Sequence, residues 1–322
     1  MPKSGSYMSY MRRTRQIKPH LPSRAECHRN GPRSGIFNPE AGLLCCCLMF
    51  SMVASADTSV WEIRDGESRI FLGGTVHLLR PGDYPLPDEF EQAYQQTDEL
   101  YFETDIASMN DLSVQAQMLQ QLTYADERSL ESVLNQEAYK ALAEYTESVG
   151  MPIMLMQKFK PGMVVSTLQV LEFQRLGFTP QGVDAHFSAR ARGDGKPVGA
   201  LETVQEQIGF LAAMGEGYES EFILLSLEDL ADTGVMMEAM ITAWREGDAD
   251  GLTSMFVADM RDRAPALYDS LLKQRNLDWL PQLREMLSDS DTEFVLVGAA
   301  HLVGDDGLLA MLDALGYQVQ QL

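Results

Sequence analysis

Histidine is used sparingly in this chain, and two of its histidines end the same phrase. Five histidines occur in 322 residues, and only His77, His186 and His301 lie after residue 56. His77 and His301 each close a Gly-x-x-His phrase that follows an apolar run typical of a β-strand. Because imidazole both transfers protons near neutral pH and binds metal ions, the repeat marks these two residues as candidates for chemistry. Taken alone, either histidine could instead be a structural residue of the core or of a loop, with its hydrogen bonds satisfied.

Two carboxylates end further predicted strands. Glu103 ends the predicted strand 98–103, and Glu202 ends the predicted strand 196–202. In open α/β sheets ligands bind beyond the carboxyl ends of the strands, so parallel strands would bring both histidines and both glutamates to one edge. Two imidazoles with two carboxylates suit a divalent metal ion. A solvated acid at a strand end is the alternative for each glutamate.

Two other phrases carry polar groups suited to a site. Asp184 and His186 lie at a predicted helix start, where Asp184 could equally be a simple N-cap. Arg275, followed by Asn276, could hold a carboxylate or neutralise developing negative charge; a cation at the C-terminal end of a helix is the alternative. Residues 57–322 contain no Gly-x-Ser-x-Gly, no Walker loop and no His-Glu-x-x-His sequence.

The elements that must position these residues form one predicted α/β domain over residues 57–322. Alternating or apolar runs predict strands at both ends of the domain, and the pattern between them is helical. The expected fold is therefore a mixed β-sheet flanked by helices, closed by pairing of N- and C-terminal strands, with a helical insertion at about residues 108–176. The predicted strands are 60–64, 69–76, 98–103, 196–202, 293–299 and 317–319; the other predicted helices are 88–96, 182–192, those within 204–287, and 305–315.

Residues 1–56 have the order of a secretory signal. Eight basic and two acidic residues precede an apolar run at residues 43–54, and an Ala-x-Ala site ends at residue 56. This run is shorter than the roughly 20 residues of a membrane span. We expect cleavage and a periplasmic or secreted protein; an uncleaved anchor or a disordered tail is the alternative. Lipidation at Cys45–Cys47 is disfavoured because residues 42–44 fit a lipobox poorly.

The rest of the chain is strongly acidic. The whole chain has a net charge of −22, and since the leader has six more positive than negative charges, residues 57–322 carry −28. Such a charge repels nucleic acid and anionic membranes, so we expect neither as a partner, apart from membrane contact through an uncleaved leader. All four cysteines lie in the leader, which leaves residues 57–322 without disulfides or thiolate ligands.

Several of these phrases together resemble the TraB/GumN family, also called TraB/PrgY, which includes the animal Tiki proteins. The resemblance covers residues 59–322 and rests on several spaced motifs in the right order. These motifs are Gly74-Thr75-Val76-His77, Phe102-Glu103, Gly182-Val183-Asp184-Ala185-His186-Phe187, Gly195-Lys196-Pro197-Val198 with Leu201-Glu202, Arg275-Asn276, Gly298-Ala299-Ala300-His301-Leu302, and Gly316-Tyr317-Gln318-Val319.

The resemblance implies a fold related to erythromycin esterase, ChaN-like haem-binding proteins and Tiki, and a site built from His77, His301 and Glu103. Tiki proteins are metal-dependent proteases that prefer manganese or cobalt. Our leading hypothesis is therefore an exported metal-dependent hydrolase that resembles a peptidase and acts on a peptide bond, with a peptide or small-molecule substrate as its partner. His77, Glu103 and His301 would bind manganese, cobalt or zinc.

In this hypothesis Glu202 or Glu103 is the general base and Arg275 stabilises the oxyanion. Asp184, His186 and Asn276 are expected to support the ligands from behind. The alternative is a protein that binds or sequesters a peptide or haem without turnover. A third reading is a metal-free, esterase-like hydrolase that uses His77 and a carboxylate as acid and base.

Overall fold

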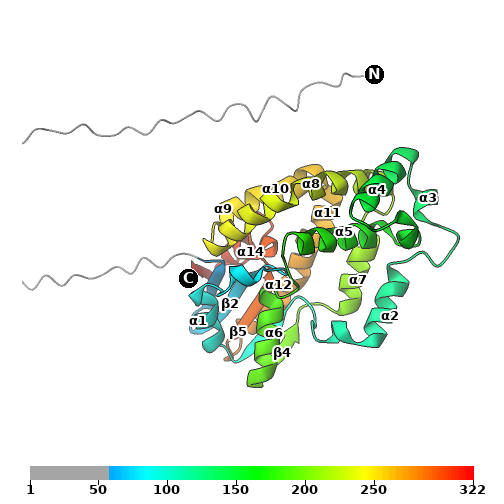
Figure 1. Ribbon diagram of the computed structural model, residues 1–322. Helices are drawn as coiled ribbons and strands as arrows, with labels where there is room; N and C mark the ends of the chain where they lie inside the picture. Colours follow the sequence, from blue (N-terminus) through cyan, green and yellow to red (C-terminus); the bar gives the residue numbers. More distant parts are fainter. Residues whose placement is uncertain (1–57) are drawn as a thin grey trace, which may run out of the picture. The chain divides into compact units, whose positions relative to one another are not determined.

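The fold is organised around one six-stranded β-sheet. The structure, a computed structural model, describes residues 58–322. The sheet order is β4-β3-β5-β2-β1-β6, and the strands lie beside one another in Figure 1. The strands are β1 (Val60–Asp65), β2 (Ser68–Thr75), β3 (Glu99–Phe102), β4 (Val198–Ala200), β5 (Glu293–Gly298) and β6 (Gln318–Gln321). The predicted mixed α/β fold is confirmed, and each strand overlaps its predicted range.

Four neighbouring strands of this sheet run in parallel. β4 pairs with β3, β3 with β5, and β5 with β2, all in the same direction. In this register Thr75 lies opposite Gly298, and Phe102 lies opposite both Leu296 and Ala200. The carboxyl ends of these four strands therefore meet at one edge, as the sequence predicts.

The two ends of the domain pair with each other at the other side of the sheet. β1 is antiparallel to both β2 and β6. The Thr58 N–H donates to the Leu322 carbonyl at 3.1 Å, and the Leu322 N–H donates to the Val60 carbonyl at 3.0 Å. The expected closure of the sheet by N- and C-terminal strands is thus present.

Fourteen α-helices of the described residues surround and extend the sheet (Figure 1). Asn135 caps α4 by accepting the Ala138 N–H at 2.8 Å, and Thr203 with Glu206 forms a capping box at the start of α7. The helices are α1 (Asp88–Gln95), α2 (Leu112–Gln121), α3 (Leu130–Val133), α4 (Gln136–Ser148), α5 (Pro161–Arg175), α6 (Val183–Asp194), α7 (Val204–Ala213), α8 (Glu219–Arg245), α9 (Ala249–Leu252), α10 (Ala258–Arg263), α11 (Pro265–Tyr268), α12 (Gln274–Met286), α13 (Ala299–Leu302) and α14 (Leu308–Ala314).

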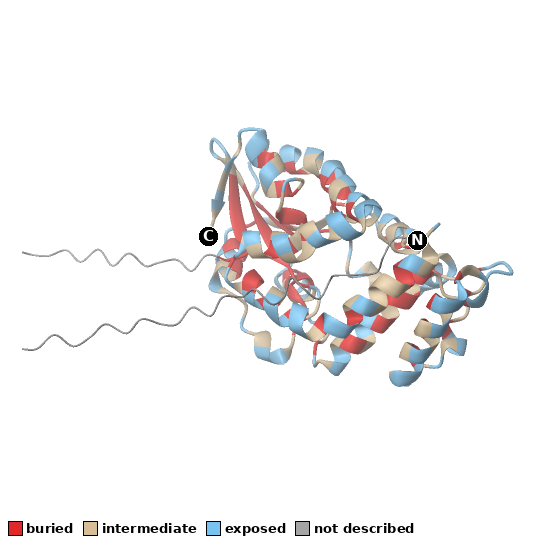
Figure 2. Cartoon of the chain, turned by 90° about the horizontal axis from the view of Figure 1, so that it is seen from above, coloured by how far each residue is buried: buried red, intermediate tan, exposed pale blue. Residues whose placement is uncertain are grey.

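An aromatic cluster joins the helices to the central strand. Phe90 of α1 and Phe187 of α6 lie 6.3 and 5.7 Å from the ring of Phe294 in β5. The Trp244 indole N–H at the end of α8 donates to the Gly74 carbonyl at 2.6 Å, which ties α8 to the end of β2. Figure 2 shows the strands largely buried. Burial of this apolar surface holds the strand ends in fixed relative positions.

The helices from α2 to α5 fill much of the expected insertion. Those from α3 to α5 share a second apolar core with the start of α8, which includes Leu142, Leu168 and Phe222. In Figure 1, α2, α3 and α4 lie away from the sheet. No helix among residues 58–322 is both long enough and apolar enough to span a membrane. The predicted leader, including its cleavage site, lies outside the described residues.

Three local expectations differ from the structure. α14 begins at Leu308 rather than Asp305. Asp184 is not the cap of α6, because Gly182 takes that position and Asp184 lies inside the first turn. His301 does not follow β5 directly but lies in the one-turn helix α13. In the last two cases the side chain makes contacts with other elements and does not terminate the helix or strand to which it was assigned.

Candidate functional site

The four strand ends bring His77, Glu103, Glu202 and His301 to the same edge of the sheet. Glu103 directly follows β3, while His77 and Glu202 lie two residues beyond β2 and β4. Backbone hydrogen bonds continue past the strands, since the Glu202 N–H donates to the Glu103 carbonyl at 2.9 Å. The candidate site therefore extends the parallel pairing of the sheet.

Gly298, the last residue of β5, lies where three of these side chains converge. A β-carbon at this position would lie 3.2 Å from Glu103 Oε1, 3.7 Å from His301 Cδ2 and 3.9 Å from His77 Nε2. The Gly298 N–H also donates to Glu103 Oε1 at 2.7 Å. The glycine of the second Gly-x-x-His phrase thus leaves open the space into which Glu103 and His77 point.

The side chain of His77 is oriented by Asp184. The Asp184 Oδ2 atom lies 2.8 Å from His77 Nδ1. Asp184 reaches this place because α6 starts against the backbone of His77: the Val183 N–H donates to the Val76 carbonyl at 3.0 Å. A β-carbon on Gly182 would lie 2.3 Å from the His77 carbonyl oxygen, so this close approach requires glycine.

His77 is the accessible member of the site. Its side chain is 64% exposed, whereas the side chains of Glu103, Glu202 and His301 are all 8% exposed or less. The negative charge of Asp184, with a smaller effect from Glu103, raises the pKa of His77 to about 9. Solvent screens a charge pair at such an exposed group, so we expect an upward shift that is smaller than this.

Arg275 holds the buried part of the site together. Its Nε and Nη2 atoms donate to the two carboxylate oxygens of Glu202 at 2.9 and 2.6 Å. Nη2 also donates to Glu103 Oε2 at 2.5 Å. Nη1 donates to His301 Nε2 at 3.0 Å and to the Leu271 carbonyl at 3.2 Å. A guanidinium has five N–H bonds, and these contacts use all five.

This arrangement bears on the predicted roles of Arg275 and Glu202. Arg275 has no free N–H to donate to an oxyanion, and Glu202 is held bidentately rather than free to act as a base. Burial nevertheless raises the pKa of Glu202. Burial also acts to raise the pKa of Glu103, but the positive charge of Arg275 helps to lower it overall. Both predicted roles therefore require Arg275 to move.

His301 is held as a neutral imidazole. Arg275 can only donate, so His301 Nε2 accepts and the proton lies on Nδ1. That Nδ1–H donates to Asn276 Oδ1 at 2.7 Å. Asn276 is oriented in turn because its Nδ2 donates to the carbonyls of His301 and Asp306 at 3.0 and 2.8 Å. Burial, together with Arg275, lowers the pKa of His301 to about 3.

The predicted metal ligands fit a metal ion only in part. His77 Nε2 is available, and a carboxylate on the other ring nitrogen is the usual way to orient a metal-binding imidazole. Glu103 Oε1 also faces the space at Gly298. His301 Nε2, however, already accepts from Arg275. Within residues 58–322 no group of three or more His, Cys, Asp or Glu side chains is arranged to hold a metal ion. Three-ligand binding stays a prediction that needs Arg275 to leave His301.

The supporting residues predicted from sequence divide into two kinds. Asp184 contacts His77, and Asn276 contacts His301, as described above. His186 instead lies outside the cluster, with its ring 5.6 Å from Tyr84 and 5.0 Å from Phe187. Burial, followed by the charge of Arg190, lowers the pKa of His186.

Other residues of the site were not predicted. Trp279 lies 4.5 Å from the His301 ring and 4.7 Å from the Arg275 guanidinium. Gln207 Nε2 lies 3.5 Å from Glu103 Oε2. Next to the site in the chain or the sheet, Thr75 lies opposite Gly298 and Thr104 follows Glu103, and the buried hydroxyls of both have no partner among the described protein atoms. Two of these residues could have been indicated by sequence. Thr75 lies inside the first Gly-x-x-His phrase, and Trp279 lies one helical turn after Arg275.

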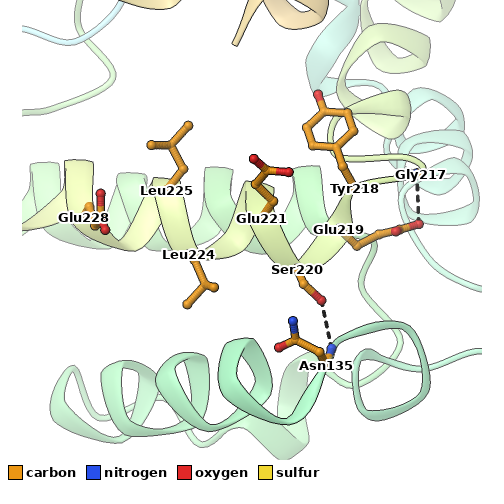
Figure 3. A pocket seen from close by; sticks show the side chains of 9 residues that line it. All are labelled: Asn135, Gly217, Tyr218, Glu219, Ser220, Glu221, Leu224, Leu225 and Glu228. Carbon is orange, nitrogen blue, oxygen red and sulfur yellow. Dashed lines mark hydrogen bonds between the residues drawn. The ribbon is translucent and has the colours of Figure 1, made fainter. Parts of the chain in front are cut away.

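A separate hollow of about 590 Å³ lies at the start of α8 (Figure 3). Its lining is acidic and includes Glu219, Glu221 and Glu228. Asn135, the N-cap residue of α4, also lines it. The Asn135 N–H donates to Ser220 Oγ at 2.8 Å across this hollow. None of the candidate site residues lines it.

Comparison with known proteins gives a family and two relatives. The profile described as the TraB/PrgY/gumN family matches residues 59–321. The uncharacterized protein YbaP of Escherichia coli (strain K12) is 24% identical over 254 residues, which covers 77% of this chain and 89% of that protein. The uncharacterized protein YbaP of Shigella flexneri matches with the same identity and coverage. No solved structure matches significantly.

Proposed function

The chain belongs to the TraB/PrgY/gumN family, and from the geometry of its site we propose that it is a hydrolase of peptide-type carbonyl bonds. The observation that carries the proposal is the pair of Asp184 and His77. An exposed imidazole has its Nδ1 held at 2.8 Å by a buried carboxylate, while its Nε2 faces the space at Gly298. This is the arrangement of a general base with an orienting acid.

In the proposed reaction, neutral His77 takes a proton from water at Nε2 as the water oxygen adds to the carbonyl carbon. The C–N or C–O bond then breaks, and the protonated Nε2 returns the proton to the leaving group. Asp184 keeps the imidazole in position and stabilises its charged form. The negative charge of Glu103 adds to that stabilisation. Arg275 acts by holding Glu103 and Glu202 in place.

Metal dependence remains a testable part of this proposal. A divalent ion, when bound, would lower the pKa of a bound water and polarise the carbonyl. His77 Nε2 and Glu103 Oε1 are the atoms that could hold it. The proposed proton transfers at His77 do not depend on such an ion.

The test is cleavage of peptide pools and activated esters by the purified full chain. Reactions are run with chelator, without chelator, and with added manganese. We expect turnover that His77→Ala and His77→Gln reduce by about 1000-fold. Turnover that survives in both variants would refute the role of His77, whereas loss of turnover in both also shows that the wild-type activity does not come from a contaminating protease. Absence of turnover with retained peptide binding would favour the sequestering alternative, and a Soret band lost in His77→Ala would favour haem binding.

We further propose export to the periplasm or cell exterior. This rests on the sequence of residues 1–56 alone. Expression of the full chain in a bacterial host, followed by N-terminal sequencing of the protein recovered from the periplasm, tests it. A cytoplasmic protein that retains Met1 would argue against export.

A further inference from the structure

We infer that Arg275 is the resident cation of this site and occupies the position on His301 that a metal ion would need. The inference deepens the proposed function, because it assigns the positive charge of the site to the chain itself. It rests on the donor set and its hydrogen bonds.

The first step concerns the lone pair of His301. A neutral imidazole has one ring nitrogen with a free lone pair, and here that nitrogen is Nε2. Arg275 Nη1 lies 3.0 Å from it. The opposite nitrogen cannot serve instead, because its proton is donated to Asn276, whose amide is fixed by two backbone carbonyls. A metal ion and Arg275 therefore compete for one atom.

The second step concerns charge. Glu103 and Glu202 are both buried, with side chains 8% and 6% exposed. Buried carboxylates require a counter-charge in contact with them. Arg275 supplies it to both glutamates through three hydrogen bonds. A divalent cation at His301 would lie beside this guanidinium and be repelled by it.

The third step concerns how firmly Arg275 is held. All five of its N–H bonds are engaged, and the residue is 7% exposed. Trp279 and Phe210 lie 4.7 and 5.5 Å from the guanidinium carbon, which leaves aromatic rings beside the charged plane. Moving Arg275 would leave two buried carboxylates without a counter-charge. We therefore infer that the arginine side chain keeps a fixed position in the folded protein.

Cobalt titration of the full chain tests the inference, with the visible ligand-field bands of Co²⁺ as the readout. We expect the wild type to show no binding that depends on His301. Arg275→Gln should bind Co²⁺ about tenfold or more tightly than the wild type, and Arg275→Gln combined with His301→Gln should lose that gain. Wild-type binding as tight as that of Arg275→Gln, and lost in His301→Gln, would overturn the inference.

A measurement on the unaltered protein covers the case in which Arg275→Gln fails to fold. Long-range ¹H–¹⁵N spectra report which nitrogen of His301 carries the proton. We expect an unprotonated Nε2 and a protonated Nδ1, unchanged by saturating Zn²⁺. A shift of Nε2 to a metal-bound value would refute the resident role of Arg275. Neither readout uses turnover, so failure of the hydrolase proposal and failure of this inference are distinguishable.

Discussion

His77 and His301 each close a Gly-x-x-His phrase, but their environments are opposite. His77 is exposed, and Asp184 raises its pKa, whereas His301 is buried, neutral and held between Arg275 and Asn276. A group that exchanges protons with substrate must be reachable, so the chemistry is assigned to His77. His301 is buried, and it helps to fix the position of Arg275 by accepting a hydrogen bond from it.

The first prediction at this scale concerns the charge of Asp184. In Asp184→Asn the anion that favours the protonated imidazole is removed, so the pKa of His77 should fall toward its ordinary value of about 6.5. The acidic limb of the pH–rate profile should move to lower pH with it. NMR titration of the His77 ring protons measures the change. Asp278→Asn, at an exposed acid on α12, should leave the pKa of His77 where it is, and an unchanged value in Asp184→Asn would contradict the pairing.

The second prediction concerns the space at Gly298. The backbone φ is −50°, so alanine is unstrained there, but its β-carbon would meet Glu103 Oε1 at 3.2 Å. We expect Gly298→Ala to lower kcat/KM by about 100-fold because Glu103 and the substrate are displaced. The free energy of unfolding should change by no more than about 1 kcal/mol.

Gly209→Ala is the matched control for Gly298→Ala. Gly209 lies inside α7, and a β-carbon there meets nothing within 4 Å. This variant should keep full activity and gain about 0.5–1 kcal/mol of stability, since alanine favours a helix more than glycine does. Equal activity in the two alanine variants would show that the space at Gly298 is not used.

At the scale of elements, the parallel strands have two distinct ends. Their carboxyl ends carry the candidate site, while the amino end of β5 carries an acid, Glu293, that is 3% exposed. Glu293 lies opposite Glu99 in the register, and its Oε2 atom has no partner among the described protein atoms. Burial first, and the neighbouring acids after it, raise the pKa of Glu293 to about 7.

The third prediction follows from that pKa. The folded chain retains a proton on Glu293 that the unfolded chain releases near pH 4.5, so stability should fall as the pH rises from about 4.5 to about 7 and stay reduced above it. Glu293→Gln should remove this dependence and stabilise the protein at pH 8 by on the order of 2 kcal/mol. Denaturant unfolding at pH 5 and pH 8 measures the difference. Glu285→Gln, at an exposed acid, should leave the difference intact, and a destabilised Glu293→Gln would contradict the assignment.

The strands and the carboxyl-edge site could be predicted from sequence because both depend on short-range patterns. Apolar runs mark β2 and β5, and the residues that follow each strand are then brought together by parallel pairing. The role of Asp184 could not be predicted, since an acid at a helix start has the same local signature whether it caps the helix or binds His77. Four of the five contacts of Arg275 are with Glu103, Glu202 and His301, which lie in other elements, and no local pattern records them.

At the scale of the whole molecule, charge is the dominant feature. The chain has 47 acidic and 25 basic residues, and the excess lies in residues 57–322. Mutual repulsion of like charges destabilises a compact state, and dissolved salt screens it. The acidic lining of the hollow at the start of α8 is one local instance of this excess.

The fourth prediction concerns this repulsion. Raising the ionic strength from about 10 to about 150 mM shortens the Debye length from roughly 30 to roughly 8 Å. We therefore expect the melting temperature to rise by a few degrees. Calorimetry in NaCl and in KCl should give the same rise, because screening does not depend on the identity of the cation. A fall in melting temperature would mean that surface ion pairs outweigh the repulsion.

The pairing of β1 with β6 also sets an order of events in time. β1 and β2 are synthesised first, but their partners β6 and β5 are synthesised last, more than 200 residues later. The sheet cannot assemble until almost the whole polypeptide has left the ribosome, because contacts so distant in sequence form late. Until β5 and β6 have been synthesised, β1 and β2 lack these partners, so the sheet that positions the candidate site closes only at the end of synthesis.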